Sequence, residues 1–189
     1  MTRLTVGVAI LFLVVAGCGG DGDDTGTSSA ETEWADSVCS AADDVSSSLS
    51  GLTDALDVDT GSGAGEAMDQ IQSELSDRVD DVQQSVAALS DAVTELPTDA
   101  SAAITSAEED LSSDAEALKS SFEGLSGALS KAADASDAEA FTTALTESST
   151  ELAATQDALA TLANDIGDYA QSSEAAVRQA FEEAPSCQA

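Results

Sequence analysis

The chain has 189 residues, of which 37 are acidic and only 5 basic, and its formal net charge at pH 7 is −32. This charge argues against a nucleic-acid partner, because binding nucleic acid needs clustered Lys and Arg to displace counterions. The chain contains no histidine, so the commonest neutral-pH base and the commonest metal ligand are missing. We therefore expect no catalytic residue, no metal ligand and no cofactor.

The first 17 residues have the three parts of a signal peptide. Arg3 supplies the positive charge, residues 4–15 form an apolar run, and Ala16-Gly17 supplies the small residues before a cleavage site. An apolar run of about 12 residues is shorter than the roughly 20 that span a bilayer as a helix. The sequence predicts a signal peptide over residues 1–17, and an uncleaved transmembrane anchor is the alternative.

Cys18 follows these small residues directly. Val15-Ala16-Gly17-Cys18 resembles the lipobox of bacterial lipoproteins, although Leu is more usual at the position of Val15. The resemblance implies that the Cys18 thiol carries a diacylglyceryl group, that the chain is cut before Cys18, and that the new amino group is acylated, for example with palmitate. Several acyl chains anchor a protein stably, so the resemblance implies a protein held at the extracytoplasmic face of the cell membrane.

Residues 18–31 are interpreted as a flexible acidic tether rich in Gly, Ser and Thr. Residues 19–30 contain no apolar side chain larger than that of alanine, so they cannot bury enough surface to offset their ordering entropy. We interpret the acidic run Asp21, Asp23 and Asp24 as solvated linker rather than as a cation site.

Residues 32–189 are predicted to form an acidic helical bundle. Apolar residues recur at spacings of three and four, the signature of helices that pack along one stripe. The first helix breaks at the Gly-rich residues 57–65, and Pro97 ends the second. The first two stripes contain Trp34, Val38, Ala42, Val45, Leu49, Leu52 and Leu56, then Met68, Ile71, Leu75, Val79, Val82, Val86, Leu89, Val93 and Leu96.

Two further helices follow. Thr98 or Asp99 is the expected N-cap of the third helix, and Ser136 or Asp137 that of the fourth. The fourth is predicted as the longest, running on until Pro185 closes it. The stripes contain Ile104, Ala107, Leu111, Ala115, Leu118, Phe122, Leu125, Leu129 and Ala132, then Phe141, Leu145, Ser148, Leu152, Thr155, Leu159, Leu162, Ile166, Tyr169, Ser173, Val177 and Phe181. Hydroxyls on the fourth stripe are expected to bond back to their own helix.

Short loops between helices of similar length predict an all-α fold, an antiparallel up-down-up-down four-helix bundle with long, coiled-coil-like helices. In this topology the loops at residues 57–65 and 134–137 point away from the membrane. A protein partner would meet the bundle at these distal loops.

Cys39 and Cys187 remain once Cys18 is assigned to the lipid. An exported chain passes through an oxidising compartment, where two leftover cysteines usually pair. The sequence predicts a disulfide between them, and two free thiols are the alternative. A zinc site would need four ligands from Cys and His, which argues against one here.

The sequence lacks the catalytic motifs that we searched for. There is no Gly-x-Ser-x-Gly elbow, no Ser-x-x-Lys pair and no phosphate-binding loop. Residues 57–61 resemble the start of a calcium loop, but position 12 would be Met68 rather than Glu. Carboxylate pairs occur throughout the chain, so the sequence singles none of them out.

Trp34-Ala35-Asp36-Ser37-Val38-Cys39, with Cys187 at the far end, is similar to small exported all-helical proteins of unknown function. The leading hypothesis is a lipid-anchored structural or interaction module at the cell surface, without catalytic activity. The alternative is a binding module for an apolar ligand or for loosely bound cations, with divalent cations held only weakly.

Overall fold

The computed structural model describes residues 28–56 and 66–188, with the side chains of residues 66–72 and 138 left out. Cys18, the predicted signal peptide, most of the predicted tether and the predicted loop at 57–65 lie outside these residues. Within them the chain is helical and contains no strand. The all-α prediction is therefore confirmed for the described part of the chain.

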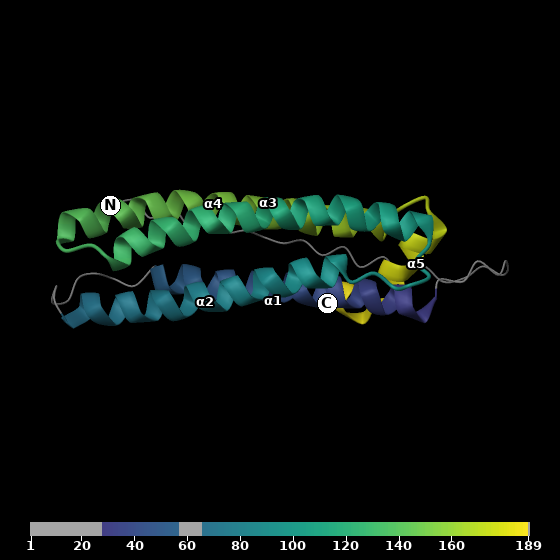
Figure 1. The fold of residues 1–189 in the computed structure, drawn as a ribbon, viewed down its shortest axis with the longest axis horizontal. Helices are drawn as coiled ribbons and strands as arrows, with labels where there is room; N and C mark the ends of the chain where they lie inside the picture. Colours follow the sequence, from purple (N-terminus) through teal and green to yellow (C-terminus); the bar gives the residue numbers. More distant parts are fainter. Residues whose placement is uncertain (1–27, 57–65, 189) are drawn as a thin grey trace.

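Four long helices and one short helix make up this part. They are α1 (Ser29–Leu56), α2 (Glu66–Thr94), α3 (Ala102–Ala133), α4 (Ala138–Tyr169) and α5 (Ala175–Glu183), followed by the 3-10 helix η1 (Pro185–Gln188). Figure 1 shows the four long helices lying lengthwise along the molecule, with α5 at one end. The most extensive contacts join α3 to α4 and α1 to α2, and α2 also packs on α3.

The apolar stripes form the core. Burying one Leu or Val side chain stabilises the fold by about 1.5–3 kcal/mol, so this stripe-to-stripe packing holds the long helices together. Leu145, Leu159 and Ile166 of the α4 stripe are only half-buried. Large stripe residues with almost no exposure are Val38, Val45, Leu52, Val82, Leu89, Val93, Ile104, Leu111, Leu118, Leu125 and Leu162.

None of the described helices has a segment that is both long enough and apolar enough to cross a membrane.

Helix α1 begins at Ser29, so the last residues of the predicted tether belong to the helix. The cause is a capping box, in which Ser28 and Glu31 satisfy each other's backbone. The Ser28 N–H donates to Glu31 Oε2 at 3.0 Å, and the Glu31 N–H donates to Ser28 Oγ at 3.2 Å. These bonds supply partners for backbone groups that a helix start leaves unpaired.

The N-caps of α3 and α4 differ in how well the sequence predicted them. Asp137 caps α4 as expected, accepting from the N–H groups of Glu139 and Ala140. The prediction for α3 was wrong, because Ser101 and not Thr98 or Asp99 is its N-cap. A turn follows Pro97, in which the N–H of Ala100 donates to the Pro97 carbonyl at 3.1 Å, and α3 begins only after this turn.

The fourth helix does not run on to Pro185. It ends at Tyr169, and a turn leads into α5. In this turn Ser172 Oγ accepts from the N–H of Glu174 at 3.1 Å, while the Ser172 carbonyl accepts from Arg178 Nη1 at 2.9 Å. Serine hydroxyls compete with the helical backbone pattern in this way. Ser173 consequently lies exposed in the turn and not on an apolar face.

The C-terminal elements pack on the start of α1. Phe181 of α5 lies edge-on to Trp34, with ring centroids 5.7 Å apart, and stacks on Tyr169 at the same centroid distance. Cys187 lies at disulfide-bonding distance from Cys39, with the two Cα atoms 5.1 Å apart, in agreement with the predicted pair. The N–H of Ser186 donates to the Asp36 carboxylate at 2.7 Å.

Candidate functional site

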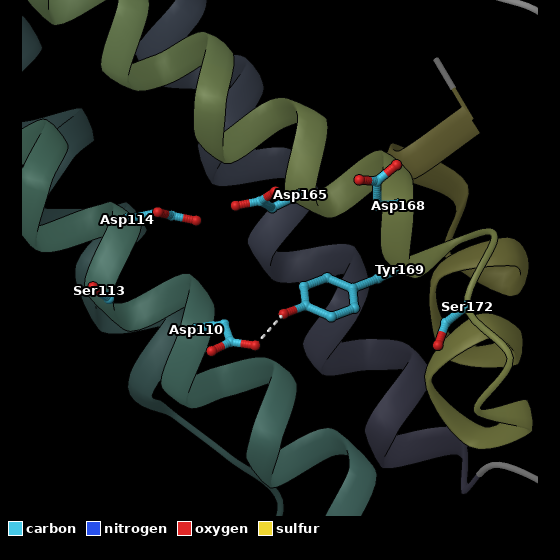
Figure 2. Close-up of a pocket in the computed structure, with 7 residues that line it drawn as sticks. All are labelled: Asp110, Ser113, Asp114, Asp165, Asp168, Tyr169 and Ser172. Atoms are coloured by element: carbon cyan, nitrogen blue, oxygen red, sulfur yellow. Dashed lines mark hydrogen bonds between the residues drawn. The ribbon is translucent and has the colours of Figure 1, made fainter.

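A cavity of about 410 Å³ opens between α3 and α4, close to the turn that leads into α5 (Figure 2). Every residue of its lining carries a polar group, and four of them are aspartates. Seven residues line it: Asp110, Ser113, Asp114, Asp165, Asp168, Tyr169 and Ser172. This acidic cavity is the most chemically distinctive site among the described residues.

Helical spacing brings these side chains together. Asp110 and Asp114 are four residues apart, and Asp165 and Tyr169 are also four apart, so each pair shares one face of its helix. The neighbours of these aspartates in sequence, Leu111 and Ile166, belong to the apolar stripes. The acidic faces therefore meet at the edge of the packed seam between α3 and α4.

Asp114 is the most perturbed carboxyl group of the cavity. Its Oδ2 atom is buried and has no hydrogen-bond partner among the described residues. Burial raises the pKa of Asp114 to about 6, helped by the hydrogen bond that it can form with Asp165 once it is protonated and by the negative charges of Asp165 and Asp110. That hydrogen bond needs a proton, since two ionised carboxylates have no donor between them. Asp114 is thus a group that titrates close to neutral pH.

Tyr169 closes one side of the cavity. Its hydroxyl donates to Asp110 Oδ2 at 3.1 Å. Burial raises the pKa of Tyr169 far above its usual value, and the hydrogen bond to Asp110 and the charges of Asp110, Asp165 and Asp114 raise it further. The phenol therefore stays protonated and acts as a fixed donor to Asp110.

The lining of the cavity offers no cationic group and no arranged set of metal ligands. No lysine or arginine is among its seven lining residues. Among residues 28–56 and 66–188, no group of His, Cys, Asp and Glu is arranged to hold a metal ion. The carboxylates are spread along the seam rather than converging on one point, which fits protons or loosely held cations better than a coordinated ion.

A second cavity of about 390 Å³ lies in the groove between α2 and α3. Val86 and Phe122 are its buried apolar residues, and Asp91, Lys119 and Glu123 are its charged ones. Its lining residues are Gln83, Val86, Ala87, Ser90, Asp91, Lys119, Phe122, Glu123 and Ser126. Charges of both signs at its rim suit neither a purely apolar nor a purely cationic ligand.

Most of the predicted site residues are not brought into either cavity. Cys18 and the acidic run at 21–24 lie outside the described residues. Cys39 and Cys187 join α1 to η1 and line neither cavity. Ser148 and Thr155 are buried and donate to the carbonyls of Ala144 and Glu151 on their own helix, as predicted.

Sequence reasoning missed the acidic cavity because carboxylate pairs occur throughout this chain. A more specific sequence signal was the position of two aspartates beside the apolar stripes. Asp114 and Asp165 each lie next to a stripe residue in sequence, at positions that border the core. An aspartate at such a border is desolvated when two helices meet there, which raises its pKa.

No family model matches the chain, and comparisons with curated proteins and with solved structures find no match. The function of the chain is therefore inferred from its own residues.

Proposed function

We propose that this chain is a lipid-anchored extracytoplasmic protein that serves as a structural or interaction module and has no catalytic activity. The observation that carries the proposal is the sequence Val15-Ala16-Gly17-Cys18 after an apolar run of about 12 residues. The absence of histidine from the whole chain supports the non-catalytic part. An oxidised Cys39–Cys187 pair is typical of exported proteins, and the short distance between these residues supports that location.

We further infer that the four long helices form an up-down-up-down bundle. Short connections at residues 95–101 and 134–137, with packing of α1 on α2, α2 on α3 and α3 on α4, support this arrangement. The start of α1, the end of α4, and α5 then share one end of the bundle, as the ribbon in Figure 1 suggests. Only 10 residues lie between Cys18 and Ser29, so this end would be nearest the lipid.

The anchor is tested by labelling cells with a radioactive or alkynyl fatty acid. We expect label on the wild-type protein and on the double variant Cys39→Ser/Cys187→Ser, which keeps Cys18. The Cys18→Ala variant should lose the label and either leave the membrane fraction or remain unprocessed. A wild-type protein without label would overturn the proposal, and label that persists in Cys18→Ala would place the lipid elsewhere.

The interaction role is tested with a photo-crosslinking amino acid placed at opposite ends of the bundle. Ala135 lies in the connection between α3 and α4, and Gln188 lies in η1. If the distal loops meet a protein partner, Ala135 should give a discrete crosslinked band in intact cells and Gln188 should not. Equal crosslinking from both positions would contradict a partner that docks at the distal end.

Loose cation binding is the second candidate function, and the four aspartates of the α3–α4 cavity favour it over an apolar ligand. Calcium titration followed by NMR, at constant ionic strength, tests it. Shifts should concentrate at Asp110, Asp114 and Asp165 and should weaken in Asp165→Asn. Shifts spread evenly over all acidic helices would instead indicate screening of the overall charge.

A further inference from the structure

The carboxyl groups of Asp114 on α3 and Asp165 on α4 point toward each other across the seam between the two helices (Figure 2). Asp114 Oδ2 is buried without a hydrogen-bond partner in the described part of the chain. With both groups ionised, the pair offers only acceptors, and neither carboxylate can donate to the other. A single proton on the pair turns one acceptor into a donor, which satisfies the buried oxygen and removes the repulsion.

The surroundings of the pair favour this proton. Asp110 lies one turn before Asp114 on the same face of α3, and its negative charge acts on Asp114. Asp168 and Tyr169 line the cavity from α4. Arg178 of α5 is a nearby cation, but its guanidinium is directed at the Ser172 carbonyl, at 2.9 Å, and at Glu182, at 3.9 Å. Helices α1 and α2 contribute no residue to the cavity lining. Negative charge around Asp114 is therefore not balanced by any residue that lines the cavity.

Tyr169 connects the α3–α4 cavity to the end of the bundle where α5 packs. Its hydroxyl donates to Asp110 in the cavity, and its ring stacks on Phe181 at an interplanar angle of 23°. Phe181 in turn lies edge-on to Trp34, whose Nε1–H donates to the Val93 carbonyl at 3.1 Å. If α3 and α4 move apart at Asp114 and Asp165, Tyr169 moves relative to Asp110. The packing of Phe181 of α5 on the Tyr169 ring then changes as well.

We propose that Asp114 and Asp165 form a proton-operated clasp, in which one shared proton draws α3 and α4 together and seats α5 through Tyr169 and Phe181. Loss of the proton leaves two facing carboxylates, loosens the seam and weakens the packing of Phe181 on Trp34. The clasp is a property of the helical domain and does not depend on the proposed lipid anchor or partner.

The raised pKa of Asp114, about 6, gives the direction of the effect. The folded state holds a proton that the unfolded chain, with an aspartate pKa near 3.8, has already released. Stability from the clasp is therefore complete below about pH 3.8 and is lost as the pH rises through about 6. Closed and open forms would interchange between mildly acidic and neutral conditions.

The test uses the full-length chain and two independent measurements from pH 4.5 to 8. Carboxyl-carbon NMR should show Asp114 titrating with a midpoint near pH 6. Fluorescence of Trp34, the only tryptophan, should change with the same midpoint as Phe181 loosens. In Asp114→Asn the amide supplies a permanent donor to Asp165, so the fluorescence step should disappear. The melting temperature at pH 7.5 should rise by about 2–4 °C.

Asp157→Asn is the matched control, because it removes the same charge from an exposed position on α4. This variant should keep the wild-type fluorescence step near pH 6. An Asp114 midpoint below about pH 4.5 in the wild type would overturn the proposal, and so would a step that survives in Asp114→Asn. If Asp114→Asn does not fold, the wild-type titration and the Asp165→Asn variant, which supplies the same donor from α4, decide the question.

Discussion

The carboxylate of Glu31 joins the first turn of α1 to Ser101, the N-cap of α3. Glu31 Oε1 accepts the N–H of Ser101 at 2.8 Å, while Oε2 accepts the N–H of Ser28 within the capping box. Glu31 is only 4% exposed. One buried carboxylate thus satisfies backbone donors at two helix starts that lie 70 residues apart in sequence.

Glu31→Gln should destabilise the protein by about 1–3 kcal/mol, because the amide nitrogen would face a backbone N–H that needs an acceptor. Burial by itself raises the pKa of Glu31, but hydrogen bonds from Ser101 and Ser28 outweigh burial and lower it. A lowered pKa means that the stabilisation is present above the unfolded value of about 4.5 and is lost as the pH falls below it. The cost of Glu31→Gln should therefore shrink toward pH 3.

Urea unfolding at pH 7 and pH 3 measures this cost. Glu33→Gln is the matched control, because Glu33 is exposed on the same helix and its loss should change stability by less than about 0.5 kcal/mol. If both variants changed the free energy of unfolding equally at pH 7, the hydrogen bonds of Glu31 to the starts of α1 and α3 would not contribute to stability.

Breaking the Cys39–Cys187 link should lower stability strongly. The two residues are 148 apart in sequence, and closing a loop of that length stabilises by up to about 5 kcal/mol in the chain-entropy model. Non-reducing mass spectrometry of the purified protein should show the linked peptides, and thermal melts should shift down after reduction. The double variant Cys39→Ala/Cys187→Ala serves as control, because reductant should not change its melting. Free thiols at both positions in the untreated protein would contradict the pairing.

Phe181→Ala should cost about 3–5 kcal/mol, since Phe181 is 1% exposed and packs on two aromatic rings. Because one of these rings is Trp34, its fluorescence should shift to longer wavelength in the folded variant. Phe141→Ala is the comparison, as Phe141 is buried in a separate small cluster with Ala132 and Ala144. It should destabilise without changing Trp34 emission. A Trp34 spectrum unchanged in Phe181→Ala would show that α5 does not pack there in solution.

Added salt should stabilise the fold. With a net charge of −32, like charges crowd neighbouring helical turns, and each such pair costs a few tenths of a kcal/mol. Screening shortens the reach of these repulsions to about 3 Å at 1 M salt. A relief of about 2 kcal/mol would raise the melting temperature by about 4–8 °C in 1 M NaCl. KCl should act like NaCl, and a melting temperature that stays flat or falls in both salts would contradict this account.

Lowering the pH from 7 toward 4.5 should also stabilise. Burial raises the pKa of Asp114 to about 6, and burial and the charge of Asp44 raise the pKa of Asp43 above its usual range. Carboxyl groups with raised pKa values contribute stability that grows as the pH falls through those values. Circular-dichroism melts should therefore show a maximum between pH 4 and pH 5, below which the loss of the Glu31 carboxylate acts in the opposite direction. Melting temperatures that fall steadily from pH 7 to pH 4.5 would mean that paired carboxylates outweigh crowded ones.

Some features followed from local sequence because their cause is local. The apolar stripes, the Asp137 cap and the hydroxyl-to-carbonyl bonds of Ser148 and Thr155 depend on residues within four positions of each other. The Ser28 and Glu31 capping box has an equally local signature, and reading it would have placed the start of α1 correctly. The Cys39–Cys187 pair followed from counting the cysteines that remain if Cys18 carries the predicted lipid.

The sequence by itself determined the class of fold and the stripes that build its core, because apolar residues at spacings of three and four fall on one face of a helix. Tertiary structure alone decided which polar groups lost their water. Asp114 became the perturbed carboxyl because α4 brings Asp165 against it, and Glu31 became a buried acceptor because the start of α3 lies beside α1. It also decided where the last helix breaks, since the turn after Tyr169 lets Phe181 reach Trp34. Desolvation and long-range contact depend on which helix faces pack together. The spacing of apolar residues along one helix does not specify which other helix it contacts.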